Sequence, residues 1–273
     1  MNLASEKSRE LRQNGFTVLR NVVDKDQINK LNQFFSDNID HFSKGDPFDE
    51  FGLKHDVQNG ILFDVYQRYP VFRPLAELPI VGEILKSVIG EHIYLYENSL
   101  VFAPRFDSTD VPWHQDFQNR PDEPIAYVAF IALDELGKDS GALRVIKESH
   151  KAGFLPYRTK SGKGHHTGIP EDKYVTLDLE QLETVDQSPG DIIIFNQLVV
   201  HSIPPWKSDS LGRGVRFSYK GFDKMFTPRL SPITIFGGSP SKFSSSYDKS
   251  PKHSDLSLKK KLKNKIKTFL MKV

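Results

Sequence analysis

The chain has 273 residues, no cysteine and a formal net charge of +2 at pH 7. This length allows one large domain or two small ones. Without cysteine, disulfides, thiolate zinc sites and cysteine nucleophiles are excluded, so any bound metal must be held by His, Asp or Glu. The first residues show no signal-peptide pattern, and no apolar stretch approaches the roughly 20 residues of a bilayer span. We therefore expect a cytoplasmic protein.

Charge is distributed unevenly along the chain. Residues 249–273 hold nine lysines and one aspartate, a local charge of +8, so the residues before them sum to −6. The acidic body predicts no nucleic-acid binding by the folded domain. Within 255–273 the apolar residues fall on one helical face, which predicts a basic amphipathic helix that contacts an anionic membrane or an acidic partner. Packing of this helix against the acidic body is the alternative.

Helical patterns dominate the first third of the chain. Residues 4–14 form a predicted helix ended by Gly15, and the β-branched residues of 16–22 predict a strand. Asp24 is the expected cap of a second helix. Residues 62–89 again show helical spacing, interrupted by two prolines.

Strand patterns dominate the rest, up to a Ser/Pro/Lys-rich stretch. The expected strands are 92–103, 125–133, 142–146, 191–196 and 214–222. Helices followed by many strands predict a mainly β fold, an antiparallel sandwich or jelly roll with N-terminal helices packed on one sheet. We expect one domain over 1–237, a flexible linker over 238–254 and the basic helix over 255–273.

A histidine and a carboxylate stand two residues apart at His114 and Asp116. Side chains two apart on an extended strand point to the same side and lie roughly 6.5 Å apart, so both can bind one ion. His201, after the apolar residues 192–200, is the third candidate ligand. Two histidines and one carboxylate with open positions are typical of non-haem Fe(II) oxygenases.

Several further motifs accompany these residues in a fixed order. They are Asn14–Asn21 (NGFTVLRN), Trp113–Asp116 (WHQD), Ser140–Ile146 (SGALRVI) leading to Glu148–His150 (ESH), Pro189–Asp191 (PGD), and His201-Ser202 before an arginine-bearing region. Together they span roughly residues 5–225. In these motifs the chain resembles the phytanoyl-CoA dioxygenase (PhyH)-like family of Fe(II)/2-oxoglutarate oxygenases.

The resemblance implies a double-stranded β-helix, the cupin-like form of the jelly roll, with His114, Asp116 and His201 as iron ligands. It also implies Fe(II) as cofactor, 2-oxoglutarate and O2 as cosubstrates, and hydroxylation of a C–H bond. Halogenating relatives lack the carboxylate, so Asp116 favours hydroxylation. The mixed charge of the expected rim loops favours a small, polar substrate.

In the family, an arginine beyond the distal histidine binds the far carboxylate of 2-oxoglutarate, and two arginines compete for this role. Arg213 lies nearer the usual spacing, whereas Arg216 shares one side of a strand with the hydroxyl of Ser218. A guanidinium beside a hydroxyl suits a buried carboxylate, so Arg216 with Ser218 is favoured. Asn98 is a further candidate contact for the cosubstrate or substrate.

Two other functions fit the same pattern. The chain could be a catalytically silent β-barrel binding module. It could also be a cupin-like enzyme that uses another divalent metal without 2-oxoglutarate, because ligand geometry alone does not fix metal identity.

Overall fold

The computed structural model describes residues 2–43, 60–102, 111–116, 124–159, 167–204, 207 and 212–221. The chain divides into a unit of residues 1–222 and a second unit of 223–273. The predicted domain end at 237, the linker and the basic helix all lie outside the described residues. No helix in the described ranges is long and apolar enough to cross a membrane.

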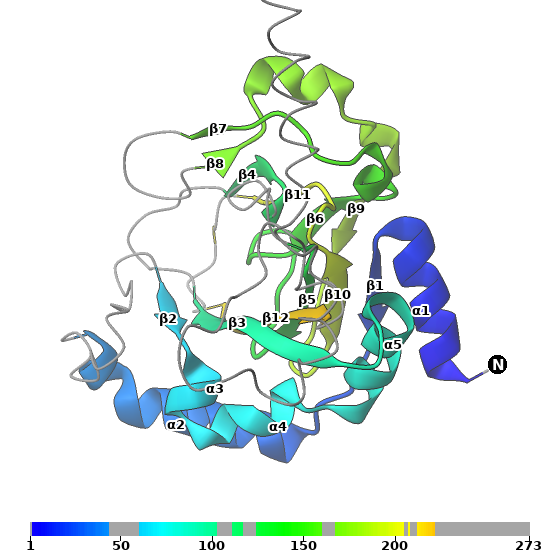
Figure 1. The fold of residues 1–273 in the computed structure, drawn as a ribbon. Coiled ribbons are helices and arrows are strands. Elements are labelled where there is room, and N and C mark those ends of the chain that lie inside the picture. The colour runs from blue at the N-terminus through cyan, green and yellow to red at the C-terminus, as the bar shows by residue number, and fades with distance from the viewer. Residues whose placement is uncertain are drawn as a thin grey trace, which may run out of the picture. The chain divides into compact units, whose positions relative to one another are not determined.

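Two antiparallel sheets form the body of the protein. The six-stranded sheet has the order β1-β10-β5-β12-β3-β2, and the four-stranded sheet has the order β4-β11-β6-β9. In Figure 1 the four-stranded sheet lies above the six-stranded one. The strands are β1 Phe16–Leu19, β2 Ile61–Phe63, β3 Ile93–Val101, β4 Val111–His114, β5 Tyr127–Ala132, β6 Leu143–Ile146, β9 Leu182–Val185, β10 Ile192–Asn196, β11 His201–Ile203 and β12 Gly214–Gly221. From β3 to β6 and again from β9 to β12 the chain alternates between the two sheets, and β6 and β9 pair within the four-stranded sheet. This is the double-stranded β-helix that the resemblance implied.

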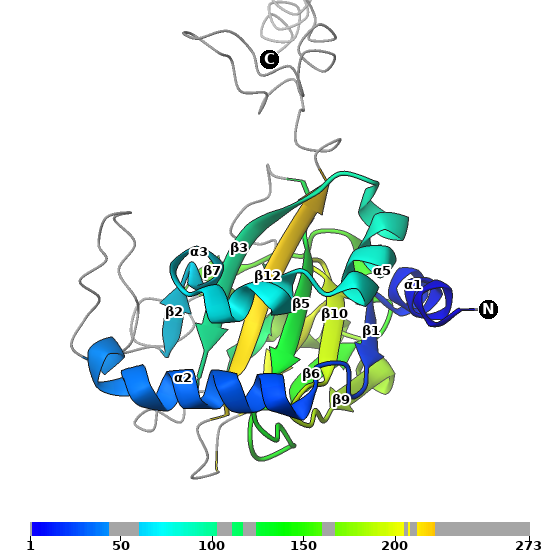
Figure 2. The same ribbon diagram turned by 90° about the horizontal axis from the view of Figure 1, so that it is seen from below.

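The helices cover the outer face of the six-stranded sheet, as Figure 2 shows from below. They are α1 Leu3–Asn14, α2 Lys25–Ser43, α3 Val65–Arg68, α4 Arg73–Ala76 and α5 Pro79–Ile89, with a 3-10 turn η3 at Pro70–Phe72. Val215, Phe217 and Tyr219 of β12 pack into the core that these helices make with the sheet. Because strand side chains alternate, the residues between them face the four-stranded sheet. This alternation decides which residues of β12 reach the barrel interior.

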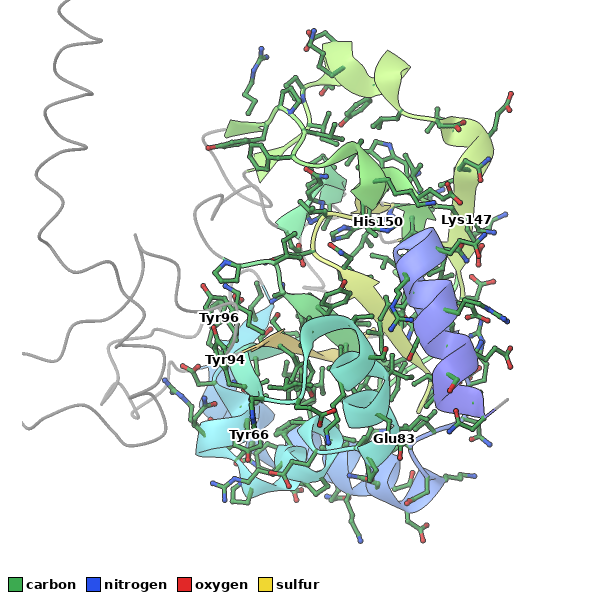
Figure 3. All side chains as sticks on the ribbon, turned by 45° about the vertical axis from the view of Figure 1, so that its right-hand side comes forward. Tyr66, Glu83, Tyr94, Tyr96, Lys147 and His150 are labelled. Atoms are coloured by element: carbon green, nitrogen blue, oxygen red, sulfur yellow. The ribbon has the colours of Figure 1, made fainter. Side chains whose placement is uncertain are left out.

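The start of the chain is fixed against the barrel by local contacts. Gly15 ends α1 at φ +85°, and the backbone N–H of Gln27 donates to Asp24 Oδ1 at 2.8 Å, which confirms both predicted helix boundaries. His150 Nε2 lies 3.1 Å from the carbonyl oxygen of Arg12, at the end of α1 (Figure 3). His150 belongs to η5, Ser149–Ala152. It therefore ties the first helix to the turn after β6.

A smaller group of elements follows η5. It comprises a hairpin of β7, Arg158–Thr159, with β8, Thr167–Gly168, and two 3-10 helices, η6 at Glu171–Thr176 and η7 at Leu179–Gln181. Ile169, Trp113, Tyr174 and Leu177 share a small apolar cluster there. This cluster covers the side of β4 that faces away from the barrel interior.

One element prediction was wrong: residues 61–63 form the edge strand β2 rather than the start of a helix, and three residues are too few to show a strand period. The predicted strand 191–196 is confirmed as β10, which ends at Asn196 although the apolar residues continue to Val200. There the Asn196 side chain accepts a hydrogen bond from the N–H of Leu198 at 2.8 Å, and the resulting turn carries the chain into the other sheet. His201 consequently begins a separate strand.

Candidate active site

His114 and His201 are brought together by strand pairing. β4 and β11 are antiparallel neighbours, and His201 lies directly opposite His114 in their register. Asp116 follows two residues after His114, just beyond the end of β4. One ligand atom from each of the three side chains lies within 4.8 Å of the others. The three residues form a compact group that could hold a metal ion.

Backbone carbonyls fix the orientation of both imidazoles. His114 Nδ1 lies 2.8 Å from the carbonyl oxygen of Pro112, and His201 Nδ1 lies 2.9 Å from that of Val199. A carbonyl only accepts hydrogen bonds, so each Nδ1 must carry the proton. With Nδ1 protonated, Nε2 is the ring nitrogen that can bind a metal, and the Nε2 atoms of His114 and His201 lie 3.4 and 3.5 Å from Asp116 Oδ1. This is the tautomer in which a histidine binds metal through Nε2.

Burial and charge hold these groups in the protonation states of metal ligands. Burial lowers the pKa of His114, and the neighbouring His201 lowers it further, so the ring is neutral at pH 7. Burial would raise the pKa of Asp116, but the Arg216 guanidinium together with hydrogen bonds from His114 and His201 outweighs burial and holds this pKa well below its ordinary value. Asp116 is therefore an ionised carboxylate.

The two candidate arginines lie on opposite faces of the six-stranded sheet. Arg216 Nη2 donates to Asp116 Oδ2 at 2.8 Å, which places Arg216 in the barrel interior beside the histidines. Arg213 instead donates to both oxygens of Asp134 at 2.9 and 2.7 Å, and its guanidinium lies 4.9 Å from the Phe35 ring centroid on the helix side. The structure thus brings Arg216, and not Arg213, to the predicted metal ligands.

Ser218 and Asn98 also lie on opposite faces of the six-stranded sheet. Ser218 shares the inner face of β12 with Arg216, and its buried Oγ has no hydrogen-bond partner among the described residues. Asn98 faces the helices, where its side chain accepts a hydrogen bond from the N–H of Tyr66 at 2.7 Å and donates one to Gln67 at 2.9 Å. Asn98 therefore stabilises α3 and is not part of the cluster, because its position on β3 alternates away from the interior.

Gln115 holds the two neighbouring candidate ligands in place. Its Nε2 donates to the carbonyl oxygens of Gly153 and Leu198 at 2.9 and 2.7 Å, and its Oε1 accepts from the N–H of Leu155 at 2.9 Å. Because side chains alternate along an extended chain, Gln115 points away from His114 and Asp116. Its contacts join three segments that are far apart in the chain, so no local pattern could reveal them.

Glu97 is a site residue that the sequence reasoning missed. It lies on β3, and its Oε1 accepts a hydrogen bond from Arg216 Nη1 at 3.0 Å. Arg216 therefore lies between two carboxylates. Burial would lower the pKa of Arg216, but Asp116 and Glu97 outweigh burial and raise it. The alternation of side chains along β3 could have predicted that Glu97 faces the interior. It could not have predicted the distance between Glu97 and Arg216.

Two imidazoles and one carboxylate on one side of an ion would leave the other coordination positions open, an arrangement typical of non-haem iron oxygenases. The double-stranded β-helix and this cluster indicate that class of protein, and comparison with known proteins places the chain in a family.

The model of the family named phytanoyl-CoA dioxygenase (PhyH) matches residues 11–215. A probable phytanoyl-CoA dioxygenase of Caenorhabditis elegans is 22% identical over 241 residues, which cover 81% of this chain and 76% of the relative. An ectoine dioxygenase of Nocardia farcinica is 22% identical over 218 residues, which cover 72% of this chain and 71% of the relative. The crystal structure of EctD from S. alaskensis with 2-oxoglutarate and 5-hydroxyectoine has a TM-score of 0.64 at 18% identity, covering 87% of this chain and 85% of that one.

The chain belongs to the phytanoyl-CoA dioxygenase family. It is an Fe(II)- and 2-oxoglutarate-dependent dioxygenase that hydroxylates a small molecule with O2. The family, the fold and the cofactors predicted from the sequence are thereby confirmed.

Proposed function

We propose that His114, Asp116 and His201 bind the Fe(II), and that Arg216 and Ser218 bind the distal carboxylate of 2-oxoglutarate. The convergence of three ligand atoms within 4.8 Å carries this proposal, because those atoms come from two strands distant in the chain. With both Nε2 atoms directed at the ionised Asp116, the three side chains offer one face of donors to an iron ion.

The surroundings of Arg216 also fit 2-oxoglutarate. A buried hydroxyl without a partner, such as Ser218 Oγ, is costly unless a ligand supplies the hydrogen bond. Arg216 stands two residues before it on the same face of β12 and offers a fork of N–H donors suited to a carboxylate. When bound, iron and 2-oxoglutarate would supply the oxidation with O2 as the oxidant: one oxygen atom would enter the succinate formed with loss of CO2, and the other would enter the substrate C–H bond as a hydroxyl group.

The proposed substrate is a small, polar molecule. The support is the charged character of the interior, where Asp116, Glu97 and Arg216 lie together, and the relative named for ectoine. A bare hydrocarbon would offer no polar group to this charged interior.

Two measurements on the purified protein test the proposed function. Under argon, Fe(II) and 2-oxoglutarate together should produce a visible charge-transfer absorption that neither produces alone. In air, the same mixture should form succinate from 2-oxoglutarate, faster when a substrate is present. Turnover with Zn(II) in place of Fe(II) and no need for 2-oxoglutarate would instead favour the cupin-like metalloenzyme. Formation of the complex with no turnover for any small molecule would favour the silent binding module.

We also propose that one oxygenase domain ends near residue 237, and that residues 255–273 form a basic helix that binds an anionic membrane surface from the cytoplasm. The support is the sequence, with its lysines around an apolar helical face. The full-length protein should co-sediment with vesicles containing phosphatidylserine and not with neutral vesicles, and a variant ending at residue 254 should lose this binding. Equal sedimentation of the full-length protein and the truncated variant would contradict the membrane contact. If the full-length protein binds an acidic protein but no vesicles, the helix contacts an acidic partner instead.

A further inference from the structure

Arg216 is held between two carboxylates. Its two terminal nitrogens donate to Glu97 at 3.0 Å and to Asp116 at 2.8 Å. All three side chains are largely buried, between 15% and 28% exposed. Glu97 lies opposite Ser218 in the register of β3 and β12, so it belongs to the same part of the interior as the proposed carboxylate site.

We propose that Glu97 competes with the distal carboxylate of 2-oxoglutarate for Arg216 and so weakens the binding of both 2-oxoglutarate and succinate. This inference rests on the proposed function, in which Arg216 binds that carboxylate. It adds a residue that sets affinity for the cosubstrate and eases release of the product. Both molecules are affected because both present a distal carboxylate to the same guanidinium.

The two carboxylates that contact Arg216 differ in what happens to them when iron binds. Asp116 is a proposed iron ligand, so the cation takes much of its negative charge and loosens its hold on Arg216. Glu97 is not in the ligand cluster, so iron would not bind it. Glu97 therefore remains on Arg216 when 2-oxoglutarate arrives.

The sign of the effect follows from Coulomb's law. Two carboxylates on one guanidinium lie roughly 5 Å apart, and at an effective dielectric constant of about 20 their repulsion changes a binding constant by tenfold or more. Removing the charge of Glu97 should consequently strengthen binding. A side chain that merely positions Arg216 would have the opposite effect, since its loss would free the guanidinium to move away.

The test compares Glu97→Gln and Glu97→Asp with the unmodified full-length protein. Fe(II)-loaded protein under argon is titrated with 2-oxoglutarate, and the charge-transfer absorption gives the dissociation constant. Succinate is titrated by its displacement of 2-oxoglutarate. Pyruvate, a keto acid with no distal carboxylate, is the control ligand, and thermal unfolding checks that each variant is folded.

We expect Glu97→Gln to bind 2-oxoglutarate and succinate about ten times more tightly and pyruvate with little change. Glu97→Asp, which keeps the charge, should stay close to the unmodified protein. Weaker or unchanged 2-oxoglutarate binding in a folded Glu97→Gln variant would overturn the inference while leaving the proposed function intact. An unmodified protein that forms no complex with Fe(II) and 2-oxoglutarate would overturn both.

Discussion

Replacing His201 by alanine is expected to abolish hydroxylation by removing Fe(II) from the protein. The change leaves two candidate ligands, His114 and Asp116, from one short segment. Fe(II) affinity should fall by more than the roughly 10- to 100-fold that loss of an outer hydrogen-bond partner causes. Iron bound after anaerobic reconstitution and dialysis measures the effect, and succinate formation should fall with it.

His92→Ala is the matched control for this experiment. His92 is an exposed histidine just before β3, outside the ligand cluster, so its loss should leave iron content and turnover unchanged. His201 is buried, so a thermal unfolding curve must show that His201→Ala is still folded. Full iron binding by a folded His201→Ala variant would contradict the proposed ligand set.

The second large effect is expected at Arg216. Arg216→Met should weaken 2-oxoglutarate binding by roughly a hundredfold, since hydrogen bonds to charged groups contribute about 1.5–3 kcal/mol each. Arg216→Lys keeps the charge but loses the fork, so its loss of affinity should be smaller. Anaerobic titration of the Fe(II)-loaded variants measures both constants.

Arg213→Met is the control that distinguishes the roles of the two arginines. Arg213 pairs with Asp134 on the helix side, so its replacement should leave the 2-oxoglutarate constant unchanged. Its loss should instead lower the free energy of unfolding by about 2–4 kcal/mol, because Asp134 loses its partner in a largely buried pair. The assignment of Arg216 is contradicted if Arg213→Met loses the cosubstrate and Arg216→Met keeps it.

The choice between these arginines shows what the sequence could predict. Strand alternation placed Arg216 and Ser218 on one side of β12 and the apolar Val215, Phe217 and Tyr219 on the other, and the structure has this arrangement. Spacing from His201 favoured Arg213, but spacing does not specify which face of a sheet a residue occupies. The alternation of side chains was the better guide because it reflects which face of β12 the helices bury.

Local patterns could not reveal contacts between distant segments. The contact of Glu97 with Arg216 and the three hydrogen bonds of Gln115 depend on how the strands are placed next to each other. Short strands were also missed. β9 is four residues long and half exposed, and β11 has three residues, so neither is long enough to show a period.

The pair of Arg216 and Asp116 joins the two walls of the barrel, because β12 belongs to the six-stranded sheet and Asp116 follows β4 of the four-stranded one. A cosubstrate held by Arg216 and by an iron bound to Asp116 would take over this connection. The two sheets would therefore stay joined through the reactants when the direct ion pair is broken.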